Sequence, residues 1–201
     1  MTAYVLYFNG LGYGKTRRRE RLAMRYLAKR GIMVTHAPVD WYAGESFEDL
    51  FARMVELTRA QLREHGELVL VGSSAGGSLA VNIIGELHSS RLSAVTLCSR
   101  LHETPLAWWD RRNLPRMAHI GGKRSAQAFY DSVIYCGEVT IPKLTAGDKK
   151  SIITAQQWAD FVVPRGTMNI DGMRVYKVPG LGHGWGIAVA ARCLPRIIAA
   201  W

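Results

Sequence analysis

The sequence predicts a single α/β domain over residues 1–201, built on a mostly parallel sheet of about six strands with helices on both faces. Short apolar runs rich in strand-forming residues alternate along the chain with longer segments of helical periodicity. This alternation is typical of strand–helix–strand units, in which successive strands lie parallel. A length of 201 residues suits one well-buried core, and no repeat or linker divides the chain.

The composition excludes several classes of protein. Hydrophobic residues make up 48% of the chain and charged residues 21%, which excludes disordered and fibrous proteins. No signal-peptide pattern precedes the first apolar run, and no apolar run is long enough to span a bilayer. Cys98, Cys136 and Cys193 are widely spaced and odd in number, which favours reduced thiols over a disulfide framework or a metal site. We therefore expect a cytoplasmic protein without metal or cofactor.

The net charge of +10 raises the question of an anionic partner. Much of this charge lies in segment 15–30, where a solvated helix face is the favoured explanation. No aromatic residues interleave with the first arginines, as a platform for single-stranded nucleic acid requires, and no known nucleic-acid-binding motif is present. Nucleic acid is therefore not the expected partner, although the charge favours anionic substrates and acidic surfaces.

The elements of the first half follow from local patterns. In chain order they are a strand at 3–8, a helix at about 16–30, a strand at 32–37 and a helix at 47–65. Gly31 and Gly66 are predicted to end the two helices, because glycine adopts helix C-cap conformations easily. Ser46 is the predicted N-cap of the second helix.

The loop after the first strand contains Gly-Lys-Thr, which suggests phosphate binding by residues Gly10 to Thr16. The pattern G-x-x-x-x-G-K-[ST] requires glycine at position 9, where this chain has Asn9. A loop counted from Gly10 is one residue short, so nucleotide binding is a weak alternative. We expect this loop to supply a backbone N–H group to an oxyanion instead.

The motif Gly72-x-Ser74-x-Gly76 lies between an apolar run at 68–71 and a helical segment. A serine on a sharp strand-to-helix turn needs strained backbone angles and neighbours without bulky side chains. The following helix would direct its N–H groups and positive dipole end toward the serine. A glycine-rich turn without a catalytic role is the alternative.

The second half is predicted to contain strands at 92–98, 151–155 and 173–178, and a closing helix at about 187–200. Residues 99–150 are less regular, with a helical stretch near 125–133, and are predicted to form an insertion or a partial lid. Trp108 and Trp109 in this region either line a substrate pocket with Ser73 or pack a small extra layer.

Four segments together resemble the α/β-hydrolase superfamily over nearly the whole chain. They are Asn9-Gly10, Gly72-Ser73-Ser74-Ala75-Gly76, Asp160-x-x-Val163-Pro164 and Gly182-His183-Gly184. The order nucleophile, acid, histidine is the order that this fold requires. The family often has His-Gly where this chain has Asn9-Gly10, and its long N-terminal strands are missing, so the chain is most similar to the compact members.

This resemblance implies a nucleophile at Ser74, a general base at His183 and an acid that orients the histidine. Asp160 follows the predicted strand at 151–155 and therefore lies at the carboxyl edge of the sheet, where catalytic groups gather. Asp148 precedes that strand and is the alternative acid.

The backbone N–H groups of Ala75 and Leu11 are the expected oxyanion donors. The predicted function is that of a carboxylesterase-like serine hydrolase, which cleaves a small ester through an acyl-enzyme intermediate. A thioesterase, a lactonase or an amidase would use the same residues, and a hydrolase-fold protein that only binds a ligand or partner is a further alternative.

Overall fold

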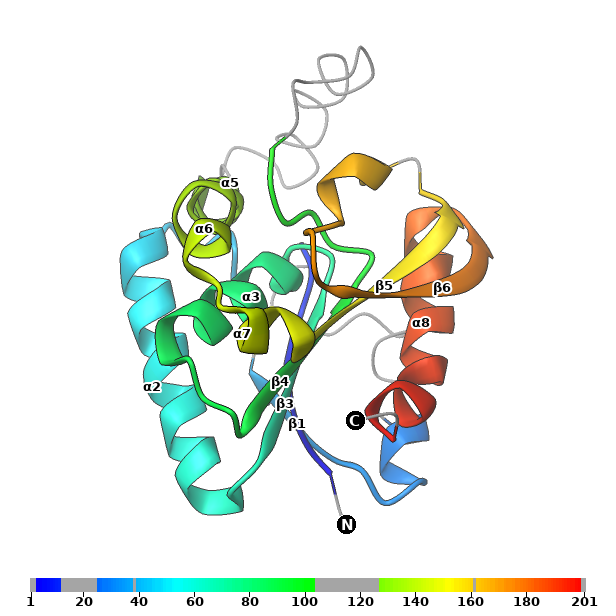
Figure 1. Cartoon of the computed structure of the whole chain (residues 1–201), viewed down its shortest axis with the longest axis horizontal. Coiled ribbons are helices and arrows are strands. Elements are labelled where there is room, and N and C mark those ends of the chain that lie inside the picture. The colour runs from blue at the N-terminus through cyan, green and yellow to red at the C-terminus, as the bar shows by residue number, and fades with distance from the viewer. Residues whose placement is uncertain (1–2, 12–24, 38, 104–126, 161, 200–201) are drawn as a thin grey trace.

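A computed structural model of the chain describes residues 3–11, 25–37, 39–103, 127–160 and 162–199 (Figure 1). Six strands form one sheet in the order β2-β1-β3-β4-β5-β6, and every neighbouring pair is parallel. The strands are β1 (Tyr4–Phe8), β2 (Met33–Ala37), β3 (Leu68–Ser73), β4 (Leu92–Leu97), β5 (Ile152–Ala159) and β6 (Arg174–Leu181). The predicted fold class is confirmed.

The strand order places a switch point beside β1. The chain passes from β1 to β2 on one side and then returns to β3 on the other side of β1. Loops that follow β1 and β3 therefore diverge at the carboxyl edge of the sheet, which is where crevices form in open α/β sheets. The predicted nucleophile turn follows β3, and Asn9-Gly10 follows β1.

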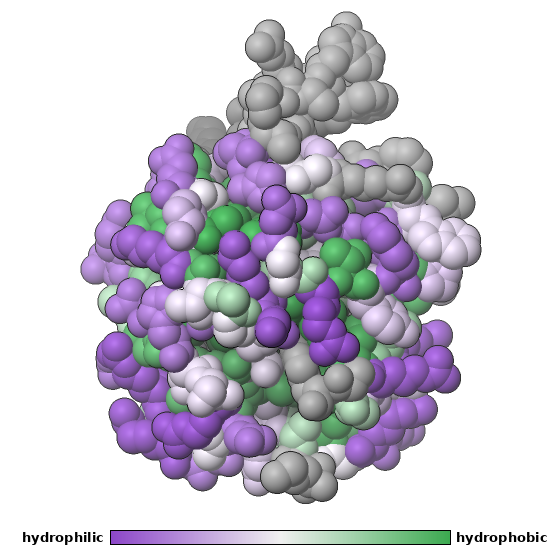
Figure 2. Space-filling view, in the orientation of Figure 1, coloured by the Kyte–Doolittle hydropathy of each residue, from purple (hydrophilic) through white to green (hydrophobic). Residues whose placement is uncertain are grey.

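Helices cover both faces of the sheet (Figure 1). They are α2 (Phe47–His65), α3 (Gly76–Leu87), α5 (Gln127–Tyr135), η1 (Cys136–Thr140), α6 (Ile141–Lys143), α7 (Ala146–Lys150), η2 (Arg165–Thr167) and α8 (His183–Ile198). One core lies between the sheet and the layer that contains α2, α3 and α5, and the second lies under α8. Both cores lie beneath a surface that is mainly hydrophilic in the view of Figure 2.

The predicted caps of α2 are confirmed. Ser46 Oγ accepts a hydrogen bond from the N–H of Asp49 at 3.1 Å, and Gly66 donates its N–H to the carbonyl of Leu62. Of the helix predicted at 16–30, residues 25–28 are helical and the part before residue 25 lies outside the described ranges. No helix in the described ranges has both the length and the apolar character needed to cross a membrane.

Three predicted boundaries near the carboxyl edge are wrong, one of them the end of β6, which lies at Leu181 instead of Val178. Strand β5 continues to Ala159 instead of ending at Ala155, because Gln156 and Gln157 pair with β6 despite their polar side chains. Helix α8 begins at His183, four residues before the predicted start. Gly182, with φ of 86°, makes the turn between β6 and the helix, so no glycine-rich loop intervenes.

The described part of the predicted insertion belongs to the main helical layer. Four buried polar residues join α3 to α5 and η1: Ser78, Asn82, Ser132 and Thr140. Ser78 Oγ lies 2.9 Å from Ser132 Oγ, and the Asn82 amide binds the Ser132 carbonyl and the Thr140 hydroxyl. The lid role of 99–150 stays a prediction, and residues 104–126 lie outside the described ranges.

Candidate active site

Ser74 occupies the sharp turn between β3 and α3. Its φ of 50° lies in the left-handed region, which is strained for a residue with a side chain. The turn also needs glycine on both sides. A Cβ at Gly72 would overlap the backbone of Gly76, and a Cβ at Gly76 would overlap the carbonyl of Phe8. The Ser74 N–H donates to the carbonyl of Leu97 at 2.9 Å, which ties the turn to β4.

Ser74 is less buried than its two neighbours in the chain. Ser74 is partly exposed, whereas Ser73 and Ala75 are buried. Its Oγ lies 2.8 Å from Nε2 of His183, the first residue of α8. The hydroxyl can donate to this nitrogen when the other ring nitrogen carries the proton.

Asp160 completes this arrangement from the end of β5. Its Oδ2 lies 2.8 Å from Nδ1 of His183, and its side chain is fully buried. Its Oδ1 accepts hydrogen bonds from the backbone N–H groups of Val162 and Val163, at 2.8 and 3.0 Å. A carboxylate accepts these bonds, so the Nδ1–H of the neutral imidazole is directed to Asp160 and Nε2 is left as an acceptor.

The electrostatics of this site favour an ionised Asp160. Burial acts to raise the pKa of this carboxyl group, but the hydrogen bond and charge of His183 lower it. The N–H groups of Val163 and Val162 act in the same direction, so the net pKa lies below its ordinary value. We call Ser74, His183 and Asp160 the Ser–His–Asp cluster. The structure brings these three predicted residues together, and their catalytic roles stay predictions.

The two expected oxyanion donors come from the turn of Ser74 itself and from the loop after β1. Ala75 directly precedes α3, so its N–H belongs to the start of that helix. Leu11 follows Gly10 after β1 and packs against the core. A Cβ at Gly10 would lie 3.0 Å from Ser74 Cβ, so the loop after β1 contacts the nucleophile turn.

No family model and no curated protein matches this sequence. Solved structures do match over the whole chain. The mature lipase BlEst2 of Bacillus licheniformis is 14% identical with a TM-score of 0.74, over 99% of this chain and 91% of its own. The monoacylglycerol lipase of Paleococcus ferrophilus is also 14% identical, with a TM-score of 0.65 over 99% and 96%. A Xanthomonas campestris pv. campestris protein assigned to the alpha/beta superfamily of hydrolases is 14% identical, with a TM-score of 0.60 over 99% of both chains.

This chain has the α/β-hydrolase fold. Its identities to the solved structures are too low to transfer an activity, so the function has to be argued from the site itself.

The alternative acid, Asp148, lies in the helix that leads into the amino end of β5, far along the strand from Asp160. Its carboxylate accepts a hydrogen bond from the N–H of Thr145 at 2.9 Å and lies 2.8 Å from Nδ1 of His88. Burial acts to raise the pKa of Asp148, but hydrogen bonds from Thr145 and His88 lower it overall. Asp148 therefore closes a capping box and joins α7 to the end of α3.

Of the three predicted substrate-pocket residues, the structure describes only Ser73. Ser73 is fully buried, and its Oγ accepts a hydrogen bond from the hydroxyl of Tyr7 at 2.8 Å. Alternation along β3 places this side chain on the same face as the buried Val71, and its role in a substrate pocket stays a prediction. Trp108 and Trp109 lie outside the described residues, as does most of the loop Gly10 to Thr16.

Two residues beside the site were given no role from the sequence. Cys98 follows β4 with φ of 51° and is buried near Asp160. Burial, with the charge of Asp160 adding to it, raises the pKa of this thiol to about 12. Asn9 is buried at the end of β1, and the only sequence signal for it is an Asn-Gly pair directly after a strand. Within the described ranges, no group of three or more His, Cys, Asp or Glu side chains could hold a metal ion.

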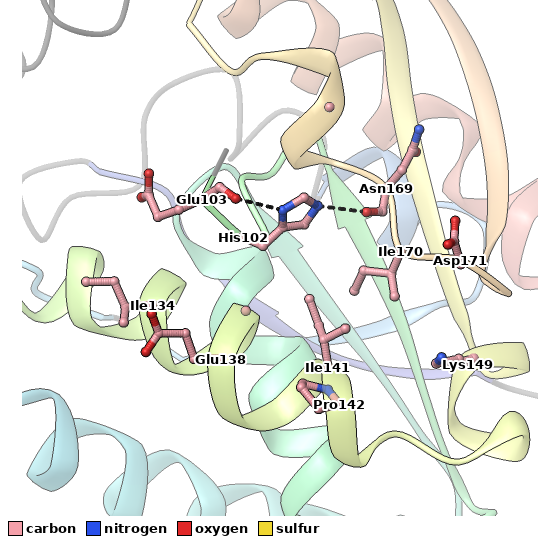
Figure 3. Close-up of a pocket in the computed structure, with 12 residues that line it drawn as sticks. His102, Glu103, Ile134, Glu138, Ile141, Pro142, Lys149, Asn169, Ile170 and Asp171 are labelled. Atoms are coloured by element: carbon pink, nitrogen blue, oxygen red, sulfur yellow. Dashed lines mark hydrogen bonds between the residues drawn. The ribbon is translucent and has the colours of Figure 1, made fainter. Parts of the chain in front are cut away.

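A separate cleft of about 730 Å³ opens between the α5–α6 segment and the turn at 166–171 (Figure 3). Its lining includes Ile134, Glu138, Ile141, Lys149 and Asp171. The ring of His102 lies between two chain segments there, with its nitrogens 3.1 Å from the carbonyl oxygen of Glu103 and 3.0 Å from that of Asn169. The Ser–His–Asp cluster does not line this cleft, so we assign it no part in the chemistry.

Proposed function

We propose that this protein is a serine hydrolase that cleaves small carboxylic esters through an acyl-enzyme intermediate. The observation that carries the proposal is the hydrogen-bonded order Ser74, His183, Asp160, with 2.8 Å at each step. A serine hydroxyl is too weak an acid to attack an ester unaided, and a neutral imidazole within hydrogen-bond reach supplies the base. Ser74 lies on the left-handed turn and is itself partly exposed, which favours access of a substrate to it.

The first half of the reaction transfers the acyl group to the enzyme. Ser74 Oγ attacks the carbonyl carbon of the ester, and its proton passes to His183 Nε2. The tetrahedral intermediate then collapses, the bond to the alkoxy oxygen breaks, and His183 returns the proton to the leaving alcohol. Asp160 keeps Nδ1 protonated, orients the ring and stabilises the imidazolium without taking its proton.

The second half restores the enzyme with water. His183 accepts a proton from the water as its oxygen attacks the acyl carbon, and the proton then returns to Ser74 Oγ as the acid leaves. In both halves negative charge develops on the former carbonyl oxygen. We propose that the N–H groups of Ala75 and Leu11 bind this oxygen, with the start of α3 adding a favourable dipole.

The substrate class is proposed from the Ser–His–Asp cluster and from the solved structures that share this fold. Two of the similar solved structures are lipases, which makes a carboxylic ester the first substrate to test. Thioesters, lactones and amides would react through the same steps, so each belongs in the same assay series. We also propose that the protein works in the cytoplasm, because its three cysteines are free.

A fluorophosphonate probe tests the proposal without knowledge of the natural substrate. We expect labelling at Ser74, located by peptide mass mapping, and hydrolysis of short p-nitrophenyl esters by the same preparation. Ser74→Ala and His183→Ala should each lose activity by roughly 10⁴- to 10⁶-fold while their circular dichroism stays native, because the members of such a cluster act as one unit. Absence of labelling in the folded wild type would instead favour a protein that only binds a ligand.

A further inference from the structure

The side chain of Asn9 is held by hydrogen bonds at both ends of its amide. It is only 6% exposed and lies directly after β1, at the switch point of the sheet. Oδ1 accepts from the N–H of Val39 at 2.8 Å, and Nδ2 donates to the carbonyl of Val39 at 3.0 Å. This pair clamps Asn9 to the segment that follows β2, and it defines which end of the amide is the donor, because an N–H group can only donate.

The same nitrogen also binds the next residue of the loop after β1. Asn9 Nδ2 donates a second hydrogen bond to the carbonyl oxygen of Gly10 at 2.9 Å. The backbone carbonyl of Asn9 in turn accepts from Trp41 Nε1 at 3.2 Å. Three buried hydrogen bonds thus join Asn9 to the segment after β2, and a fourth joins its side chain to the carbonyl of Gly10.

The Gly10 carbonyl and the Leu11 N–H belong to one peptide unit. A trans peptide is planar, so its C=O and N–H bonds point in opposite directions. The described residues include no cis peptide bond. The hydrogen bond that holds the Gly10 oxygen therefore also sets the direction of the Leu11 N–H bond.

This peptide unit lies against the nucleophile turn. A Cβ on Gly10 would be 3.0 Å from Ser74 Cβ and 3.2 Å from the carbonyl oxygen of Ser73. A small rotation of this peptide unit therefore changes the direction of the Leu11 N–H bond relative to Ser74. An oxyanion donor is effective only where it is oriented before the charge appears.

We propose that Asn9 is a positioning residue, which orients and polarises the Leu11 N–H group for the oxyanion by binding the carbonyl of the same peptide unit. The inference rests on the proposed serine-hydrolase function. A hydrogen bond to the carbonyl end draws electron density toward that oxygen and strengthens the N–H end as a donor, as in other hydrogen-bonded chains of amides. The backbone of Val39 holds the Asn9 side-chain amide that makes this bond, and Trp41 Nε1 donates to the backbone carbonyl of Asn9.

The test compares Asn9→Ala and Asn9→Asp with the wild type in ester hydrolysis, with rates divided by the concentration of active sites from fluorophosphonate titration. Both variants lose the donor to the Gly10 carbonyl, whereas Asp at position 9 still offers an oxygen to the Val39 N–H. We expect kcat to fall about ten- to hundredfold, less than the 10²- to 10³-fold loss for removal of a whole oxyanion donor. KM should change by less than about threefold, because the donor acts in the transition state.

Thr58→Val is the matched control. Thr58 is fully buried in α2, and its hydroxyl donates to the Met54 carbonyl at 2.8 Å, so this variant also loses one buried hydrogen bond. It should lower the melting temperature without changing kcat per active site. An equal kcat for wild type and both Asn9 variants, or a loss confined to melting temperature and active fraction, would overturn the proposal.

A crystal structure of the phosphonylated wild type tests the same point without a substitution. We expect a phosphoryl oxygen within about 3.1 Å of Leu11 N, with the bond from Asn9 Nδ2 to the Gly10 carbonyl retained. Labelling of Ser74 with that oxygen away from Leu11 would overturn the role of Asn9 alone. Failure of the wild type to label would refute the serine-hydrolase function, and the role of Asn9 with it.

Discussion

His183 Nε2 lies 2.8 Å from Ser74 Oγ, although 109 positions of sequence separate the two residues. Ser74 precedes α3 on one face of the sheet, and His183 opens α8 on the other face (Figure 1). The two helices can present these residues to each other only across the carboxyl edge of the strands. Changes at this edge should therefore affect chemistry, whereas changes at the opposite edge should affect stability alone.

The two buried aspartates provide a direct comparison. Asp160→Asn should lower kcat about 10⁴-fold, because an amide no longer holds His183 in the tautomer that leaves Nε2 as the acceptor. Asp148→Asn should leave kcat unchanged and reduce the free energy of unfolding by about 1 kcal/mol, through weakening of the capping box. Steady-state kinetics and urea unfolding measure both effects. A large loss of kcat in Asp148→Asn alone would reverse the assignment of the acid.

Stability should depend on pH through the same two residues. Asp160 and Asp148 both have folded-state pKa values below the ordinary value, which is about 3.9 for an unfolded chain. Around pH 4 the unfolded chain therefore binds more protons at these groups, and the free energy of unfolding rises with pH. The contribution should be fully present above about pH 5 and be lost as the pH falls through the lowered folded-state values.

Urea unfolding followed by circular dichroism, between about pH 3 and pH 6, measures this slope. The slope should be smaller in Asp148→Asn, which removes one of the two titrating groups. An identical slope in wild type and variant would show that Asp148 titrates alike in the folded and unfolded chains.

The nucleophile turn should tolerate no side chain at Gly76. Gly76→Ala would place a methyl group against the carbonyl of Phe8, and we expect it to destabilise the fold by about 2 kcal/mol or more. Gly147→Ala in α7 is the control, because a Cβ there has only one neighbour within 4 Å, Thr145 Oγ1 at 3.6 Å. That variant should be within about 1 kcal/mol of wild type. Equal melting temperatures for the two variants would contradict the close approach of β1 and α3.

The three cysteines should differ in reactivity. The thiolate is the reactive form, and burial raises the pKa of Cys98 to about 12 and also raises that of Cys136. Cys193 is partly exposed on α8. With iodoacetamide at about pH 8, mass spectrometry of the native protein should find Cys193 alkylated first, and all three after denaturation. Early labelling of Cys98 would mean that the region beside Asp160 opens to solvent.

Local sequence patterns were sufficient for much of this fold. The bounds of α2 follow from Ser46 and Gly66, which satisfy backbone groups at the helix ends within a few residues. The position of Ser74 follows from the glycines around it, because the turn requires close backbone approach there. By contrast, the end of β5 could not be predicted from local pattern. Gln156 and Gln157 are polar, which suggests that the strand has ended, but they pair with β6 and remain in the strand.

The sequence by itself therefore determined the order of strands and helices along the chain, the turn that holds Ser74, and the expectation that Asp160 lies at the carboxyl end of its strand, because these depend on spacing and on strand direction. Only the tertiary structure decided the rest. The start of α8 at His183 depends on the turn at Gly182, whose N–H binds the carbonyl of Ala159, and the proposed role of Asn9 depends on Val39, 30 positions away. Hydrogen bonds between such distant residues form only after the sheet has assembled, and no local pattern encodes them.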